Sequence, residues 1–348
     1  MIFPGSDENF EACNQNRVAR VVLQTRRRGM GIAAIQGAMP RIRLRAVVVL
    51  LVAIALGGAW DLRASDSVVV TGGLTVYTVV EGDTLQRLSA RFGVDSAVIA
   101  ADNGLKPNGR LQSGERLRID NRHIVPSIEP GTIVINVPQR MLFYADDGQT
   151  RGMPVAVGRP DWRTPTRAFT ILTMEVDPTW EVPKSIQEEA RRAGKSLSTV
   201  VPPGPNNPLG KYWLGLSIPG VGVHGTNAPS SIYRVTTHGC IRVGAADIAW
   251  LFSRASVGTR GVIAYEPILV AVVDGDVLLE VHRDVYRRLD ATPIAIVRRL
   301  VAAAGVDHQV DWAAAERLVM ASDGIARSIA DPANRDGSGG PAAAAHVH

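Results

Sequence analysis

The stretch Gly222 to Val243, GVHGTNAPSSIYRVTTHGCIRV, brings one cysteine and two histidines together in a short piece of chain. Its start, Gly222-Val223-His224, is predicted to be a strand, and Gly225 follows it. The second histidine, His238, stands before Gly239 and Cys240. Glycine permits tight backbone turns, so we expect a sharp turn directly after each histidine.

These residue types match the needs of acyl transfer through a thioester. A thiol is only a few per cent ionised at neutral pH, so a nucleophilic cysteine needs a base or a cation beside it. Amide N–H groups in a glycine-containing loop can converge on a tetrahedral oxyanion. Taken singly, Cys240 could be a small buried hydrophobe, His224 a structural residue and His238 a turn cap. Their coincidence within 17 residues favours a catalytic site.

Residues 131–267, which surround this stretch, are predicted to form a mainly β domain. Short segments alternate between apolar and polar residues, which is typical of half-buried strands, and Asp146-Asp147-Gly148 supplies a hairpin turn. Two stretches, 185–193 and 245–255, are predicted to be helices. We therefore expect mostly antiparallel β-structure with peripheral helices. The predicted strands are 132–137, 141–144, 153–157, 213–216, 222–224 and 261–265.

The stretch resembles the signature of the YkuD-type L,D-transpeptidase catalytic domain, His-Gly-Thr followed by Ser/Thr-x-Gly-Cys-x-Arg. Here it reads His224-Gly225-Thr226 and Thr237-His238-Gly239-Cys240-Ile241-Arg242. The resemblance covers nearly all of residues 131–267 and implies a β-sandwich-like fold. Two departures are Thr237, where serine is commoner, and Tyr233, where a small residue is frequent. Further matching segments are 178–180, 182–183, 201–205 and 207–227.

The resemblance implies a role for each residue of the signature. Cys240 would be the nucleophile, and His224 the proton donor and acceptor, oriented by the backbone carbonyl of Gly225. The resemblance also assigns an oxyanion hole and substrate-binding residues to the signature. Backbone amides of His238, Gly239 and Cys240 would form the hole, His238 would also orient the substrate, and Thr226, Thr237 and Arg242 would contact the substrate or support the loop.

The resemblance also implies a reaction on peptidoglycan stem peptides. Cys240 would attack the carbonyl of the third residue, a diamino acid, and release the terminal D-alanine. An amine from another stem would then give a 3→3 cross-link, or a lysine of an outer-membrane lipoprotein would attach that protein to the wall. No metal or organic cofactor is expected, and carbapenems would inactivate the enzyme by acylating the cysteine.

Residues 75–120 are predicted to form a separate β-α-α-β module. A strand at 74–79 precedes a helix with Asp83 or Thr84 at its N-cap, and Gly93 ends that helix. A second helix at 94–101 and a strand at 116–119 complete the module. It resembles the LysM family, which implies binding to glycans that contain N-acetylglucosamine, such as peptidoglycan. The matching positions are Tyr77, Val79, Gly82 to Leu85, Leu88, Phe92 to Val94, Asn103, Leu105, Leu111, Gly114 and Leu117.

The N-terminal segment 39–64 is predicted to be a signal peptide or a membrane anchor. Three arginines precede an apolar stretch, 46–60, that ends in small residues. A stretch of about 15 residues is short for a membrane helix, which needs roughly 20, but neighbouring leucines extend it. We therefore expect export to the periplasm or cell envelope, with anchoring to the inner membrane as the alternative. Residues 1–38 show no periodicity, and we expect translation to begin at Met39.

Charge and cysteine content agree with export. The net charge is +5, yet residues 1–59 hold eight arginines against three acidic residues, so the rest of the chain is neutral. Without a basic field on the folded part, nucleic acid is not expected as a partner. Because Cys13 precedes the signal, the exported part keeps Cys240 as its single thiol and forms no internal disulfide.

The C-terminal part is expected to support the fold rather than the chemistry. Residues 268–330 are predicted to form a helical extension, with amphipathic helices at 293–303 and 312–329. Residues 331–348, rich in glycine, alanine and proline, are predicted to be a disordered tail.

Two other functions stay open at this point. A hydrolase, an L,D-carboxypeptidase, would use the same site with water in place of the amine, because the choice of acceptor depends on the shape of the cleft. A wall-binding scaffold would use the LysM module alone, but it would leave the paired Cys240 and His224 without a purpose.

Overall fold

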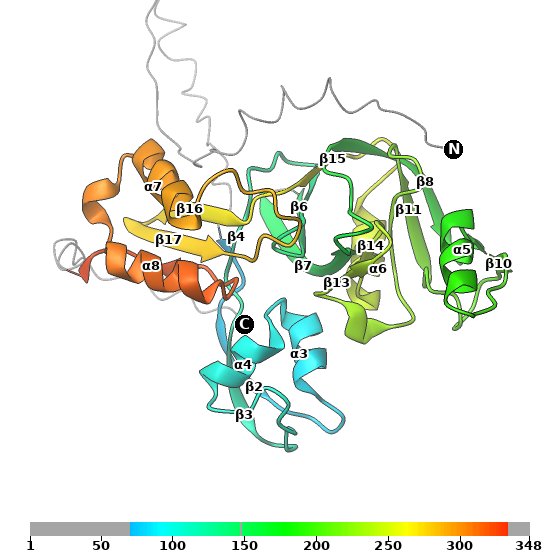
Figure 1. The fold of residues 1–348 in the computed structure, drawn as a ribbon, viewed down its shortest axis with the longest axis horizontal. Helices are drawn as coiled ribbons and strands as arrows, with labels where there is room; N and C mark the ends of the chain where they lie inside the picture. The colour runs from blue at the N-terminus through cyan, green and yellow to red at the C-terminus, as the bar shows by residue number, and fades with distance from the viewer. Residues whose placement is uncertain (1–69, 147, 333–348) are drawn as a thin grey trace, which may run out of the picture. The chain divides into compact units, whose positions relative to one another are not determined.

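A computed structural model describes residues 70–146 and 148–332 (Figure 1). The predictions for residues 1–38 and 39–64, and nearly all of the predicted tail 331–348, lie outside the described residues. Among the helices of the described part, none has both the length and the apolarity needed to cross a membrane.

The first module has the predicted β-α-α-β order, with β2 (Leu74–Thr78), α3 (Leu85–Phe92), α4 (Ser96–Asp102) and β3 (Arg116–Asp120). Strands β2 and β3 pair antiparallel. The side chain of Thr84 accepts a hydrogen bond from the backbone of Arg87 and so caps α3. Gly93 ends α3 in the left-handed conformation, with φ of 70°. Apolar side chains of both helices and β3 form one buried cluster.

Nine strands of the larger domain pair in the order β13-β7-β14-β12-β11-β8-β15-β5-β6. Six of the neighbouring pairs are antiparallel, counting an additional pairing between β6 and β7, and three are parallel. Strand β7 pairs with β6 through residues 149–154 and with β14 and β13 through residues 155–158. The long strand β7 therefore pairs with β13 and β14 at one end of this order and with β6 at the other end. The strands are β5 (Ile133–Asn136), β6 (Met141–Asp146), β7 (Gln149–Gly158), β8 (Ala168–Val176), β11 (Tyr212–Leu216), β12 (Gly222–His224), β13 (Val235–Thr237), β14 (Ile241–Val243) and β15 (Arg260–Ala264).

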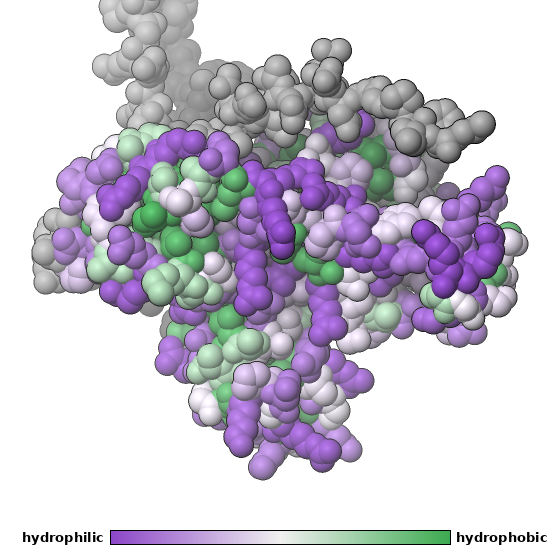
Figure 2. All heavy atoms as spheres, viewed as in Figure 1, coloured by the Kyte–Doolittle hydropathy of each residue, from purple (hydrophilic) through white to green (hydrophobic). Residues whose placement is uncertain are grey.

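Two helices belong to this domain and differ in burial. Helix α6 (Ala245–Arg254) places Ile248 and Leu251 in the main apolar core. Helix α5 (Lys184–Arg192) has no buried residue, and hydrophilic residues cover its exposed side (Figure 2). It lies between the short paired strands β9 (Trp180–Glu181) and β10 (Val200–Val201). Helix α5 is therefore held by polar contacts rather than by apolar burial.

The C-terminal extension contains a sheet as well as helices. Helices α7 (Pro293–Ala304) and α8 (Trp312–Ala321) pack on the hairpin of β16 (Ile268–Val273) and β17 (Asp276–Val281) (Figure 1). The prediction of a helix over 312–329 was wrong beyond Ala321. Ser322 and Gly324 adopt positive φ, and Arg327–Ser328 form β18 on the edge of β17. Pairing with an open strand edge outweighs the helical periodicity there.

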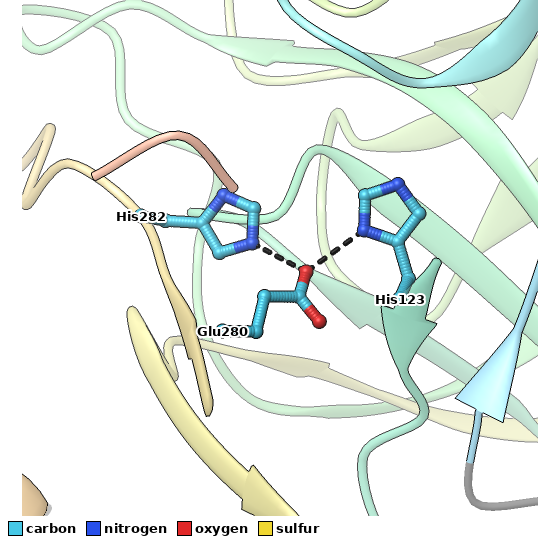
Figure 3. Close-up of side chains that lie close together, drawn as sticks. All are labelled: His123, Glu280 and His282. Carbon is cyan, nitrogen blue, oxygen red and sulfur yellow. Dashed lines mark hydrogen bonds and ion pairs between the residues drawn. The ribbon is translucent and has the colours of Figure 1, made fainter. Parts of the chain in front are cut away.

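Three buried polar side chains, His123, Glu280 and His282, join the extension to the strand that follows the first module. His123 belongs to β4 (His123–Ile124), which pairs with β1 (Val70–Thr71). Both rings point a nitrogen at the same carboxylate oxygen, Oε1 of Glu280, at 2.8 Å from His123 and 2.7 Å from His282 (Figure 3). Oε2 of that carboxylate accepts from the backbone N–H of Ile124. We call these three residues the His-Glu-His cluster.

The His-Glu-His cluster is a buried ion pair. Burial acts to raise the pKa of Glu280, but the two histidines outweigh it and hold this pKa at about 2. The other ring nitrogen of His123 lies 2.9 Å from the carbonyl oxygen of Gly93. Both partners of His123 are acceptors, so each of its ring nitrogens faces a group that can only accept a hydrogen bond.

Replacing Glu280 by alanine is expected to destabilise the protein by about 3–5 kcal/mol, because it removes the buried acceptor shared by both histidine rings and the Ile124 amide. Unfolding in urea, followed by circular dichroism, measures this. Glu188, which is exposed on α5, provides the control, and Glu188→Ala is expected to stay within about 0.5 kcal/mol of the wild type. Equal unfolding midpoints for the two variants would contradict the ion-pair interpretation.

Candidate functional site

The pairing of β12 with β14 brings the signature residues together. The two strands are parallel, with Val223 opposite Ile241 and His224 opposite Arg242. Val223 and Ile241 point into the apolar core and are 1% and 0% exposed. Because side chains alternate along a strand, His224 and Arg242 project from the other face. Cys240 immediately precedes β14, two positions before Arg242, so the same alternation places it on that face as well. Residues sixteen positions apart in the sequence thus become diagonal neighbours.

His224 is buried and held in one orientation. Its Nδ1 lies 2.7 Å from the carbonyl oxygen of Gly225, and its ring stacks on Trp213 with 5.8 Å between centroids. Since the carbonyl can only accept, Nδ1 carries the proton and Nε2 is the acceptor of the neutral ring. Burial, aided by the charge of Arg242 and opposed by the carbonyls of Gly225 and Leu209, lowers the pKa of His224 to about 4. The ring is therefore a neutral base at pH 7.

Cys240 is half-buried, and its thiol donates to the carbonyl oxygen of Gly220 at 3.4 Å. Within residues 70–146 and 148–332, no hydrogen bond joins this thiol to either histidine ring. Burial raises the pKa of Cys240, while the backbone N–H of Gly222 and the charge of Arg242 act in the opposite direction. The resting site thus holds a neutral thiol and a neutral imidazole, rather than a thiolate–imidazolium pair.

Arg242 brings a positive charge to the face that carries the thiol. Its Nε is buried and has no hydrogen-bond partner among the described residues. A buried donor without a partner costs free energy. This face therefore carries a charged side chain whose Nε has no partner among the described residues.

The loop from Thr237 to Cys240 is closed by hydrogen bonds of the Thr237 side chain. Thr237 Oγ1 donates to the carbonyl oxygen of Cys240 at 2.6 Å and accepts from the backbone N–H of Gly239 at 3.2 Å. Gly239 has φ of 109°, which favours glycine. The predicted oxyanion hole included the amide of Gly239, but that N–H already donates to Thr237. The predicted donors that remain are the amides of His238 and Cys240.

Thr226, predicted to contact the substrate, is engaged in a local turn. Its Oγ1 accepts from the backbone N–H of Ala228 at 3.0 Å. Beside it, the backbone of Gly225 lies against Leu209 and Gly210, where an added Cβ would come within 3.2 Å of the Leu209 carbonyl oxygen. The turn after His224 therefore fixes the carbonyl that orients the ring.

Two residues missed by the sequence analysis brace the loop from outside, Thr164 and Tyr286. Thr164 Oγ1 donates to the carbonyl oxygen of Gly239 at 2.9 Å and accepts from the N–H of Gly158 at 2.8 Å. The hydroxyl of Tyr286 donates to the carbonyl oxygen of Gly158 and accepts from the N–H of Thr164. Tyr286 lies in the C-terminal extension, more than a hundred positions from Thr164, so no local pattern could have indicated it.

His238 points its Nε2 at a carboxylate from α5. Nε2 lies 2.6 Å from Oε2 of Glu189, and the imidazole and the Trp162 ring form a T-shaped pair with 4.9 Å between centroids. Glu189 was not among the predicted site residues. The two histidines of the signature therefore occupy different environments, His224 buried against a carbonyl and His238 partly exposed against a carboxylate.

Comparison with known families identifies two parts of the chain. Residues 130–263 match the L,D-transpeptidase catalytic domain, and residues 77–120 match the LysM domain. The probable L,D-transpeptidase YcfS of Escherichia coli K12 is 32% identical over 259 residues, which cover 71% of this chain and 80% of that protein. The chain belongs to the L,D-transpeptidase family.

Other relatives agree with the resemblance inferred from the sequence, which is confirmed for both parts of the chain. The probable L,D-transpeptidase YbiS of Escherichia coli K12 is 33% identical and covers 60% of this chain and 69% of its own length. The probable L,D-transpeptidase ErfK/SrfK of Salmonella typhimurium is also 33% identical and covers 58% of this chain and 67% of its own. This transpeptidase acts on peptidoglycan, in the cell envelope.

The His-Glu-His cluster is the one group in the described part of the transpeptidase whose atoms lie close enough to suggest a metal site. Tetrahedral zinc with ligands at 2.0–2.2 Å would hold its ligand atoms about 3.4 Å apart. The observed separations of 2.7 and 2.8 Å, with both rings aimed at Oε1 itself, are those of hydrogen bonds (Figure 3). The cluster is interpreted as a structural ion pair.

The neutral state of the Cys240 thiol predicts its reactivity. Alkylation by iodoacetamide requires the thiolate, so the rate at the Cys240 peptide should rise with pH and reach half its maximum at a higher pH than for a free cysteine. Arg242→Met should move that midpoint further up, because it removes the charge that favours the thiolate. Peptide mass spectrometry of timed reactions measures both. A midpoint below pH 7 would indicate a resting thiolate–imidazolium pair instead.

Tyr286→Phe tests the brace behind the loop. It removes one buried hydroxyl and leaves two backbone groups without partners, which is expected to cost about 1–3 kcal/mol. We also expect lower transpeptidase activity, since the displaced loop carries Cys240. The control is Tyr212→Phe, because the Tyr212 hydroxyl has no hydrogen-bond partner among the described residues. Equal stability and activity of the two variants would rule out the brace.

Proposed function

We propose that Cys240 is the nucleophile and His224 the base of an L,D-transpeptidation that proceeds through a thioester. The observation that carries this proposal is the parallel register of β12 and β14, which places both side chains on one face beside Arg242. Membership of the family indicates the class of reaction, and the residues of this chain suggest which groups carry it out.

The first half-reaction forms the acyl-enzyme. Nε2 of His224, unprotonated at pH 7 because its pKa is about 4, accepts the Cys240 proton as sulfur attacks the carbonyl of the third stem residue. The backbone amides of His238 and Cys240 stabilise the oxyanion. His224 then passes the proton to the departing nitrogen, and D-alanine leaves. The hydrogen bond from Nδ1 to Gly225 keeps the ring in the required tautomer throughout.

Arg242 orients the donor stem. A stem peptide carries carboxylates near the bond that is cleaved, and Arg242, which is partly exposed, lies on the face that holds the thiol. A charge-assisted hydrogen bond to one of them would place the reacting carbonyl over Cys240. The same sulfur is the expected site of acylation by carbapenems.

The second half-reaction transfers the acyl group to an amine. An amine from another stem gives a 3→3 cross-link, and a lysine of an outer-membrane lipoprotein gives an attached protein. Water would give a tripeptide and make the enzyme an L,D-carboxypeptidase. The LysM domain would hold the enzyme on the glycan strands while this happens. We further propose export by the N-terminal signal, with an uncleaved membrane anchor as the alternative.

Incubation of purified protein with tetrapeptide muropeptides, followed by mass spectrometry, tests the proposal. We expect cross-linked dimers from the wild type and none from Cys240→Ala, with Glu188→Ala, exposed on α5, as a control that keeps full activity. Tripeptides without dimers would indicate hydrolysis. Dimers formed by Cys240→Ala would overturn the assignment of the nucleophile.

A further inference from the structure

Helix α5 is tied to the catalytic loop through one carboxylate, that of Glu189. Its Oε2 lies 2.6 Å from Nε2 of His238, and its Oε1 pairs with the guanidinium of Arg159. Within residues 70–146 and 148–332, these are the ion pairs that α5 makes. Because α5 has no buried residue, Glu189 is the main link between this helix and the loop.

Arg159 connects the same carboxylate to the backbone of the loop. Its N–H donates to the carbonyl oxygen of Thr237, directly before His238, at 3.1 Å. Its side chain is also held by Asp161, with 2.9 Å between Nε and Oδ1. The charge of Arg159 and the hydrogen bond from His238 keep the pKa of Glu189 below its usual value, so the carboxylate is ionised at neutral pH. Glu189 is therefore an acceptor fixed in place from two sides.

The contact with Glu189 decides which ring nitrogen of His238 carries a hydrogen. A carboxylate accepts, so Nε2 carries a hydrogen, and Nδ1 is the ring nitrogen left to act as an acceptor. Nδ1 has no hydrogen-bond partner among the described residues. His238 is also the more accessible histidine, with 26% of its side chain exposed, whereas His224 is 4% exposed.

The two half-reactions make different demands on a base. Thioester formation removes a proton from a thiol held inside the site, next to buried His224. Transfer removes a proton from an amine that arrives from solvent, and a partly exposed imidazole backed by a carboxylate suits that task, as in other acyl-transfer enzymes.

We propose that Glu189 is a positioning residue for the transfer half-reaction: by accepting the Nε2 proton of His238, it leaves Nδ1 of that ring to take the proton of the attacking amine. This inference rests on the proposed function, since it concerns the thioester at Cys240. The amine nitrogen forms a bond to the carbonyl carbon, and the carbon–sulfur bond breaks. The proton leaves the amine for Nδ1 and returns to the sulfur, which restores the neutral thiol and the neutral imidazole.

The test separates the two half-reactions. Acyl-enzyme formation is followed by intact-protein mass spectrometry with a tetrapeptide donor, and transfer by adding an amine acceptor to the preformed acyl-enzyme. For Glu189→Ala we expect acylation within about twofold of the wild type and transfer at least ~10-fold slower, because a positioned general base contributes ~10²–10⁴-fold. Glu189→Gln, which keeps an acceptor for Nε2, should recover part of the transfer rate. Glu188→Ala, one residue away on α5, should match the wild type in both steps.

A second readout reports on the ring itself. Nitrogen NMR of histidine-labelled protein distinguishes a proton on Nε2 from one on Nδ1, and the His238 signal is assigned by its absence in His238→Gln. We expect the Nε2 form in the wild type and in Glu188→Ala, and a mixture in Glu189→Ala. Equal slowing of both half-reactions, or an unchanged ring signal with unchanged transfer, would overturn the role of Glu189. Failure of the wild type to form any acyl-enzyme would instead contradict the proposed function itself.

Discussion

The parallel pairing of β12 with β14 is the constraint on which the site depends. It sets Val223 and Ile241 in the core and turns His224, Arg242 and the adjoining Cys240 to the opposite face. A shift of one residue would exchange the two faces and turn His224 and Arg242 into the core in place of Val223 and Ile241. The apolar side chains therefore fix the register of β12 and β14, and this register sets the positions of His224, Arg242 and Cys240.

The loop that follows is held by hydrogen bonds rather than by apolar packing. Thr237 closes it from within, and Thr164 with Tyr286 holds it from behind. These contacts satisfy backbone groups that a tight glycine-containing turn leaves without partners. Because Tyr286 belongs to the C-terminal extension, this segment supports the geometry of the active site. The buried pair of His123 with Glu280 adds a second connection between the extension and the rest of the described chain.

The two histidines of the signature lie in different environments. Burial keeps His224 neutral, and a carbonyl fixes its tautomer. His238 is more exposed and meets a carboxylate that Arg159 holds in place. The first environment suits a proton exchange with a buried thiol, and the second suits a proton exchange with a group that comes from solvent.

Local patterns in the sequence were sufficient for much of this protein. Alternation predicted β11 and β12 but not β13 and β14, the short strands that flank Cys240. The Thr84 cap and Gly93 fixed the ends of α3, and the signature residues identified the family, because these features depend on neighbours within a few positions. Tertiary structure decided the rest. The end of α8 at Ala321 depends on the pairing of β18 with β17, and the occupied amide of Gly239 depends on how Thr237 turns. Glu189 and Tyr286 come from segments far from the loop in the sequence. Folding brings them next to it, so no local pattern could predict their contacts.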